Sequence, residues 1–404
     1  MSDTKCVNAY MNLSIHPSGA IRPCCLTDKY LTTNEGHTRL NEASIKDFWF
    51  SNSRKDFADQ LEKGMRIPEC ITCWKEEDAG KESKRIRDNK KYQERELDLS
   101  FKSLPIVLDL SMGNLCNIKC RICAPTHSTP WLQEEAELQS PNDVKGFMKQ
   151  DKFRIGTESF HKDNKFVWED IKELLEYAEH FDFAGGEPFY IESHWKILKY
   201  CVDNGYSHNQ VVHYNTNGTI FPDKQINILN KFKVIDIQVS SDGVGPKFEY
   251  LRHGANWDKS EEVIDNFLKE KEKNETEWLV GACLSLSAFN AFDFFETYEH
   301  YAAKGLRMYI NTVHDHRGVR ILPWEIKSQL IEKISQTKSK YDPMDWKKQK
   351  DMICALLKNS KNSFCNIAWT NWCKEIKMRD KFRNESFEKT FPEYFYMLKD
   401  YFNV

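Results

Sequence analysis

Three cysteines lie within eight positions in the segment LCNIKCRICAP, residues 115–125. Cys116, Cys120 and Cys123 form a C-x3-C-x2-C pattern. Iron–sulfur clusters are normally held by four thiolates, so three thiolates leave one iron of a [4Fe-4S] cluster open to a substrate or cofactor. A tetrahedral zinc site is the alternative, with the nearby His127 as its fourth ligand. The odd number of thiols therefore favours a cluster with an open coordination position.

A second group of cysteines lies in the first 73 residues. Cys6 and Cys24 are eighteen residues apart, and Cys70 and Cys73 follow as a C-x2-C pair, with Cys25 directly after Cys24. Four thiols of this kind suit either a second cluster or tetrahedral zinc. Three isolated cysteines are instead expected to behave as small buried hydrophobes: Cys201, Cys283 and Cys354.

Further motifs follow predicted strands and carry small or polar residues. The glycine pair of FDFAGGEP (181–188) allows a ligand to approach the backbone closely, because glycine has no side chain. YNTNG (214–218), VSSDG (239–243) and YLRHGANW (250–257) supply amide, hydroxyl and guanidinium groups. The carboxyl ends of parallel strands meet at one edge of a sheet, so we expect these groups near the three cysteines.

Composition excludes several classes of protein. The chain has 404 residues, a net charge of −3 and 13 cysteines. The small net charge gives no general attraction to nucleic acid or anionic lipid, and the apolar runs are too short for a membrane span. The N-terminus lacks the features of a signal peptide. We therefore expect a cytoplasmic protein without membrane or nucleic-acid partners, whose reduced thiols bind metal.

The elements that position these motifs alternate along the chain. The runs are apolar on both faces, which predicts buried parallel strands, and amphipathic helical segments lie between them. Six βα units with right-handed crossovers build an open barrel with its active site at the strand ends. We predict an α/β fold: a partial (β/α)6 TIM-like barrel with a small N-terminal Cys-rich domain and a helical C-terminal tail. The predicted strands are 105–113, 181–188, 210–218, 234–243, 278–287 and 306–313.

Domain boundaries follow from charge and pattern. Residues 75–98 are almost entirely charged, which predicts a solvated helix or linker. No strand signal follows residue 318, and the insertion 126–165 is expected to shape a substrate pocket. The predicted parts are a cysteine-rich domain (1–84), a linker (85–104), the barrel (105–318) and a helical C-terminal region (319–404).

The cysteine segment after the first strand of a βα barrel resembles the radical S-adenosylmethionine (SAM) superfamily. In that family Cys116, Cys120 and Cys123 would hold a [4Fe-4S] cluster, and the amino and carboxylate groups of SAM would chelate its open iron. The GGE sequence is similar to the family motif that contacts the SAM amino group. Ile122 stands where an aromatic residue is usual, and it can still pack on adenine. The resemblance implies SAM contacts by Gly185, Gly186, Glu187, Asn215, Asn217, Ser240, Arg252 and Ile122.

Structural roles for several of these residues are the alternatives. Ser240, Asn215 and Asn217 are also typical of turns at strand ends. Arg252 could form an ordinary salt bridge, and Asp242 could cap an Asp-Gly turn.

The N-terminal cysteines resemble the twitch domain, the shortened SPASM module of radical SAM enzymes that holds one auxiliary [4Fe-4S] cluster. The resemblance implies Cys6, Cys24, Cys70 and Cys73 as ligands, with Cys25 as a spare or as a replacement for Cys24. A zinc ribbon is the competing interpretation. In the best known members the module follows the barrel. Here it precedes the barrel, so the chain must fold back to present it at the barrel mouth.

The resemblance implies an enzyme with two [4Fe-4S] clusters and SAM. An electron from a reductase such as flavodoxin or ferredoxin would cleave SAM to a 5′-deoxyadenosyl radical, which takes hydrogen from the substrate. An auxiliary cluster suits a net oxidation, so the expected product is a modified peptide or protein side chain. The alternatives are a dehydrogenase or rearranging enzyme for a carbohydrate or nucleotide, and a zinc-bound scaffold without activity. No side chain is assigned a catalytic role.

Overall fold

The computed structural model describes residues 3–40, 42–78, 80, 82–93, 101–150, 165–273 and 275–402. Part of the predicted linker (94–100) and part of the predicted insertion (151–164) lie outside the described residues. No helix in the described ranges is long and apolar enough to cross a membrane.

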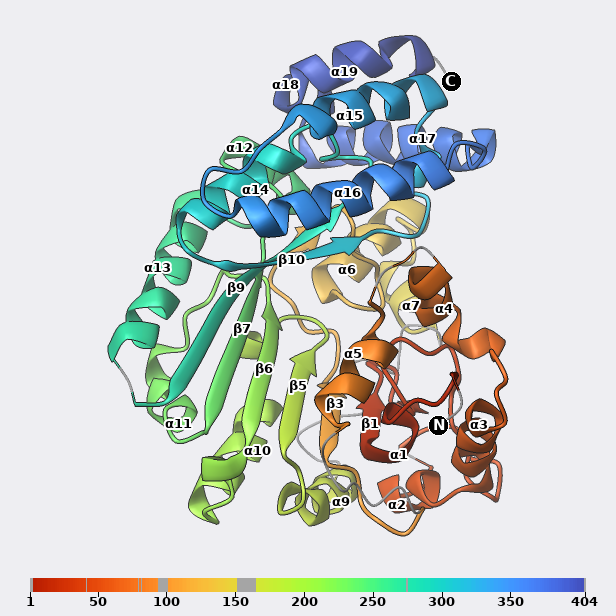
Figure 1. The fold of residues 1–404 in the computed structure, drawn as a ribbon, viewed down its shortest axis with the longest axis vertical. Coiled ribbons are helices and arrows are strands. Elements are labelled where there is room, and N and C mark those ends of the chain that lie inside the picture. The colour runs from red at the N-terminus through yellow and green to blue at the C-terminus, as the bar shows by residue number, and fades with distance from the viewer. Residues whose placement is uncertain are drawn as a thin grey trace.

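Within the described residues the main sheet has eight strands in the order β10-β9-β7-β6-β5-β3-β1-β2 (Figure 1). The six predicted strands lie parallel to one another in this sheet, which confirms the predicted α/β class. They are β3 (Val107–Ser111), β5 (His180–Ala184), β6 (Val211–Thr216), β7 (Val234–Ser240), β9 (Glu277–Leu286) and β10 (Arg307–Thr312).

The two faces of this sheet differ in polarity. Phe181 and Phe183 of β5 are buried in the apolar core, whereas His180 and Asp182 at the alternate positions are half-buried. Strands β6 and β10 alternate in the same way. The prediction that the strands are apolar on both faces is therefore wrong, because polar and apolar residues alternate along them and only one face joins the apolar core. We call the opposite side the inner face, defined by Asp109, Asp182, His213 and Asp236.

Helices cover the outer face and complete the core (Figure 1). Tyr298 of α14, for example, is fully buried in the same cluster as Phe181 of β5. The helices that follow the strands are α9 (Lys165–Leu175), α10 (Glu192–Asp203), α11 (Ile226–Leu229), α12 (Pro246–Leu251), α13 (Trp257–Lys273) and α14 (Phe294–Ala303). Short 3₁₀ turns are η1 (Pro68–Cys70), η2 (Pro188–Tyr190), η3 (Ser207–Asn209), η4 (Asp223–Gln225), η5 (Val319–Ile321) and η6 (Lys399–Tyr401).

The N-terminal region joins the barrel through main-chain pairing. β1 (Asn12–Ile15) lies parallel to β3, and β2 (Ile21–Arg22) lies antiparallel to β1. The first barrel strand therefore does not end the sheet, because β1 of the cysteine-rich region pairs with the edge that would otherwise be exposed. The helices of this region are α1 (Asn8–Met11), α2 (Ile45–Trp49), α3 (Asn52–Glu62), α4 (Ile71–Asp78) and α5 (Lys84–Lys91).

The C-terminal region is helical, as predicted, and packs at the top of the barrel (Figure 1). Trp346, Trp372 and Tyr394 are buried within the same apolar cluster as the barrel strands. The region therefore shares the barrel's core. Its helices are α15 (Trp324–Gln336), α16 (Pro343–Asn359), α17 (Asn366–Arg383), α18 (Phe387–Thr390) and α19 (Pro392–Leu398).

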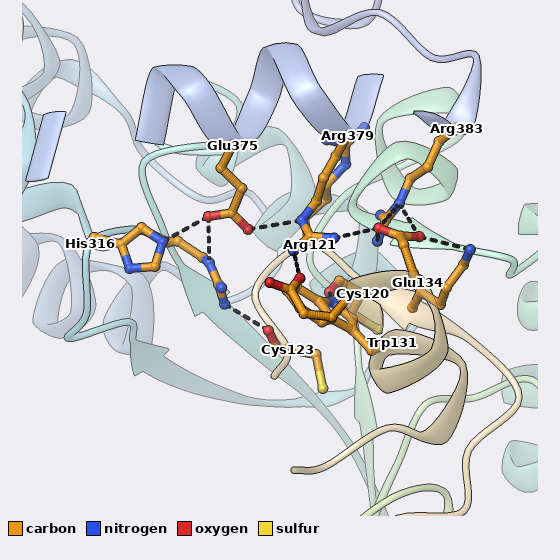
Figure 2. Close-up of polar contacts among 12 residues, drawn as sticks. Cys120, Arg121, Cys123, Trp131, Glu134, His316, Glu375, Arg379 and Arg383 are labelled. Atoms are coloured by element: carbon orange, nitrogen blue, oxygen red, sulfur yellow. Dashed lines mark hydrogen bonds and ion pairs between the residues drawn. The ribbon is translucent and has the colours of Figure 1, made fainter. Parts of the chain in front are cut away.

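Buried ion pairs connect α17 to α6 (Thr129–Gln139), which follows the three cysteines and precedes α7 (Val144–Met148) (Figure 2). Glu134 of α6 is 1% exposed and accepts from Arg379 at 2.5 Å and Arg383 at 2.9 Å. Lys119 Nζ lies 2.8 Å from the same carboxylate. Burial disfavours the charged carboxylate, but the hydrogen bonds and charges of Arg383 and Lys119 outweigh it and lower the pKa of Glu134 to about 2.

Glu134→Gln is expected to lower the free energy of unfolding at neutral pH by about 3 to 5 kcal/mol, because it leaves buried cations without their anion. The depressed pKa adds stability that is complete above pH 4.5 and is lost as the pH falls toward 2. Urea unfolding at a series of pH values should show a shallower acid dependence for the variant than for the unmodified chain. Glu137→Gln on the same helix is the control, since Glu137 accepts from the exposed Gln133. Equal acid slopes in all three proteins would contradict the prediction.

Candidate functional site

The cysteine loop, residues 115–125, follows β3 at the carboxyl edge of the sheet. Within it β4 (Lys119–Cys120) pairs antiparallel with β8 (Arg252–His253), so the loop is joined to the segment that follows β7. The amide of Arg121 donates to Leu251 O at 2.7 Å, and Trp131 Nε1 of α6 donates to Cys120 O at 2.9 Å. The loop is therefore held by main-chain contacts on two sides.

The three thiols of this loop lie close enough for their charges to interact. Burial raises the pKa of Cys120 to about 12 and that of Cys123 to about 11. The charges of Cys116 and Cys123 raise the pKa of Cys120 further, whereas the guanidinium of Arg252 lowers it. The thiolate form is thus disfavoured until a cation compensates its charge, and metal binding would release protons.

These donors fit a [4Fe-4S] cluster better than a single ion. In the described ranges, no group of three or more His, Cys, Asp or Glu side chains is arranged to hold a metal ion. In a cluster each iron takes its own thiolate, so the protein ligands are spread around a larger group. His127, the alternative zinc ligand, instead packs edge to face against His16, with ring centroids 5.8 Å apart.

The glycine pair after β5 lies directly against the cysteine loop. Gly186 has φ +56°, and a Cβ on it would lie 2.1 Å from Leu115 O. The next amide, of Glu187, donates to the same carbonyl at 2.8 Å. Only a residue without a side chain allows this approach, so the glycine fixes the entry of the loop.

Glu187 is fully buried and its carboxylate is already occupied by protein donors. It accepts from Asn217 N at 2.6 Å, from Thr216 Oγ1 at 2.8 Å and from Phe189 N at 3.1 Å. Burial raises its pKa, and these hydrogen bonds oppose the shift. The side chain therefore joins the ends of β5 and β6, which leaves the glycine backbone as the part of the motif open to a ligand.

The amide residues after β6 divide between two environments. Asn217 Nδ2 lies 3.8 Å from Cys116 Sγ and donates to Asn117 Oδ1 at 2.8 Å, so it contacts the cysteine loop. Asn215 is exposed on the inner face, where its amide lies 3.2 Å from His213 Nε2.

Arg252 is buried and forms an ion pair with Asp242. Its Nε is buried without a hydrogen-bond partner, and Asp242 also accepts from Ser285 N at 2.9 Å. The alternative of an ordinary salt bridge thus describes the geometry of Arg252. The Nε–H group of Arg252 still has no acceptor. Ser240 ends β7 beside Cys283 in register, and Ile122 is partly buried against the core.

The N-terminal cysteines separate into two sets. Burial raises the pKa of Cys6 to about 12, and Cys70 and Cys73 add to the shift, so these thiols are neighbours. Cys25 instead interacts with Cys24 and with Asp109 on the inner face. Thr27, three residues beyond Cys24, donates to Glu69 O at 3.0 Å, which holds this loop beside Cys70.

The inner face carries a row of ionisable residues that motif reasoning missed. Asp109, Asp182, His213 and Asp236 lie opposite one another in register on β3, β5, β6 and β7. His213 Nδ1 lies 3.2 Å from Asp236, which also pairs with Arg307 at 2.9 Å. The signal was present as a polar residue at alternate positions of each strand.

Comparison with protein families defines the class. Residues 110–277 match the model of the radical SAM superfamily, and residues 6–74 match that of an iron-sulfur cluster-binding domain, SPASM. The fold and the cysteine loop agree with an iron–sulfur α/β barrel. The chain thus carries a segment that matches the radical SAM superfamily, preceded by a segment that matches a SPASM iron–sulfur cluster-binding domain. These domains imply SAM and [4Fe-4S] clusters, which confirms the predicted family and cofactors.

Several solved structures show a distant similarity. anSMEcpe with bound AdoMet and Cp18Cys peptide matches at 16% identity and TM-score 0.36, over 57% of this chain and 58% of that chain. SuiB of Streptococcus suis bound to S-adenosylmethionine matches at 12% identity and TM-score 0.34, over 87% and 69% of the two chains. This chain thus spans less than two thirds of anSMEcpe. No curated protein matches the sequence. The family assignment rests on the two sequence-model matches.

Proposed function

We propose that this chain cleaves SAM reductively and oxidises a peptide or protein side chain. When bound, the [4Fe-4S] cluster and SAM supply a 5′-deoxyadenosyl radical that abstracts hydrogen from the substrate. The proposed ligands of this cluster are Cys116, Cys120 and Cys123. The electron would come from a reductase such as flavodoxin or ferredoxin.

One observation carries the proposal: the ends of β5 and β6 converge on the entry to the cysteine loop. Leu115 O accepts from Glu187 N and faces Gly186, while Asn217 contacts Cys116. A strand-end amide therefore contacts the first thiol, and the glycine pair lies against the residue before it. This arrangement is suited to an amino-acid ligand, whose amine and carboxylate need acceptors and donors close to the metal.

The remaining chain has proposed roles around this centre. The backbone of Gly185 and Gly186 would accept the SAM amino group, and Ile122 would pack on its adenine. Arg252, through its unpartnered Nε, would face the SAM carboxylate. Ser240 would contact the ribose, and Asn215 and Asn217 at the end of β6 would line the SAM pocket.

The N-terminal domain would hold a second cluster. Cys6, Cys70 and Cys73 are three of its proposed ligands. Cys24 is the proposed fourth ligand, because its loop is held beside Cys70 through Thr27, and it would exchange its present contact with Cys25 for the cluster. A substrate radical must lose an electron in a net oxidation, and a second cluster can accept it. The peptide substrate is inferred from this module, which is common among peptide-modifying radical SAM enzymes.

A second candidate is a dehydrogenase or rearranging enzyme for a carbohydrate or nucleotide. The ionisable row of the inner face favours it, because carboxylates and an imidazole can hydrogen-bond several hydroxyl groups. Asp109 Oδ2 and the neighbouring Ser14 Oγ are buried on this face without hydrogen-bond partners.

The proposal predicts that anaerobically reconstituted protein binds about eight irons. Addition of SAM should change the EPR spectrum of one reduced cluster, and dithionite should then produce 5′-deoxyadenosine. Peptide and carbohydrate candidates are compared by the increase in 5′-deoxyadenosine that each causes. An EPR spectrum that does not change when SAM is added, together with no SAM cleavage after reduction, would refute the proposed chemistry. Stimulation by sugars or nucleotides alone would select the second candidate.

A further inference from the structure

Helix α17 lies outside both family-model matches and yet packs against the cysteine loop (Figure 2). Glu375, Arg379 and Arg383 extend from this helix toward α6 and the loop (Figure 2). Two sets of contacts connect α17 and the residues after it to the main chain between Cys120 and Cys123.

The first set of contacts holds Arg121, which lies between the second and third cysteines. Its side chain is 1% exposed and pairs with Asp380 and Glu385. The guanidinium also lies 4.0 Å from the ring centroid of Tyr250, whose hydroxyl donates to Asp380 at 2.8 Å. A buried guanidinium requires such anions, so the loop at Arg121 cannot move away from α17 without leaving charges unpaired.

The second set of contacts holds the carbonyl of Cys123. Arg317 Nη1 donates to Cys123 O at 2.7 Å, and its Nε donates to Glu375 Oε2 of α17 at 3.2 Å. His316 Nε2 lies 2.7 Å from the same carboxylate. Arg317 is 7% exposed, so this bridge is shielded from water. One guanidinium thus connects the third cysteine to α17.

We propose that α17 is a positioning element for the SAM-binding cluster, and that Glu375 acts on the loop through Arg317. The inference rests on the proposed assignment of Cys116, Cys120 and Cys123 as ligands of that cluster. Groups behind metal ligands orient them, and their loss typically weakens metal retention. Loss of the carboxylate at Glu375 frees Arg317 from α17, so the third cysteine is held less firmly.

The test uses the full reconstituted chain and an iron chelator. The measured quantity is the rate at which the SAM-responsive EPR signal disappears, compared with the rate for the signal that does not respond to SAM. Glu375→Gln is expected to lose the SAM-responsive signal about tenfold faster, with the other signal unchanged. Arg317→Gln should have at least this effect, and the double variant should be no faster than Arg317→Gln alone.

Two further variants make the result interpretable. Glu388→Gln removes an exposed carboxylate from α18 in the same region and should match the unmodified chain. Arg317→Lys keeps one donor and should give an intermediate rate, which also serves if Arg317→Gln does not fold.

Three outcomes would overturn the inference. They are an unchanged rate in folded Glu375→Gln, additive effects in the double variant, and equal acceleration of both signals, which would indicate general destabilisation. If the EPR spectrum of the unmodified chain does not change when SAM is added, the proposed function is refuted instead. The two failures are therefore distinguishable.

Discussion

Cys120→Ala is expected to reduce the iron content of reconstituted protein from about eight to about four per chain. The EPR spectrum should lose the component that responds to SAM, and reduction should yield no 5′-deoxyadenosine. The reason is that two thiolates cannot hold a cluster that three already leave incomplete. Iron analysis and EPR before and after addition of SAM measure the effect.

Cys365→Ala is the matched control, because Cys365 is exposed and lies outside both groups of clustered cysteines. It should retain both clusters and full SAM cleavage. If Cys120→Ala kept the SAM-responsive signal, the assignment of the cysteine loop would be wrong. If it lost both clusters together, the two centres would not be independent.

Gly186→Ala is expected to lower the rate of SAM cleavage by about 100-fold, because a displaced ligand loop misplaces the reacting groups. The new methyl group would lie 2.1 Å from the carbonyl oxygen of Leu115, one residue before Cys116. A backbone atom cannot yield as a flexible side chain can, so the loop itself must shift. The initial rate of 5′-deoxyadenosine formation, at equal iron content, measures the effect.

Gly205→Ala separates this clash from the cost of the backbone conformation. Gly205 also has a positive φ, of +75°, but nothing lies within 4 Å of a Cβ placed there. Both variants should lose about 1 to 2 kcal/mol of stability from the left-handed conformation. Only Gly186→Ala should lose SAM cleavage, and equal loss in both variants would contradict the steric explanation.

Much of the fold was predictable because its signals are local. The apolar runs located the six predicted strands, and the amphipathic segments between them correspond to helices such as α10 and α13. The prediction that both faces of these strands are apolar was wrong, because Asp182 and His213 occupy alternate positions in otherwise apolar strands. Local hydrophobicity averages over the two faces, whereas an open barrel treats them differently.

Candidate site residues were predictable where they belong to short motifs, and their contacts were not. Asn217 was selected as a strand-end residue, and the structure brings it to Cys116. Glu187 was selected for the SAM amino group, yet its carboxylate is held by three protein donors. A motif identifies the residue type at a position, but the partner of a buried carboxylate depends on which strands become neighbours.

The proposed chemistry was readable from short motifs, because the cysteine spacing and the glycine pair are each encoded within a few consecutive residues. The contacts that hold these motifs in place follow from the fold and could not be read from the motifs. β1 extends the barrel sheet beside β3, and Asp380 pairs with Arg121 from 259 residues away. Such contacts leave no periodic pattern in the sequence. They form because a folded core needs its strand edges paired and its buried charges neutralised, whichever segment of the chain supplies the partner.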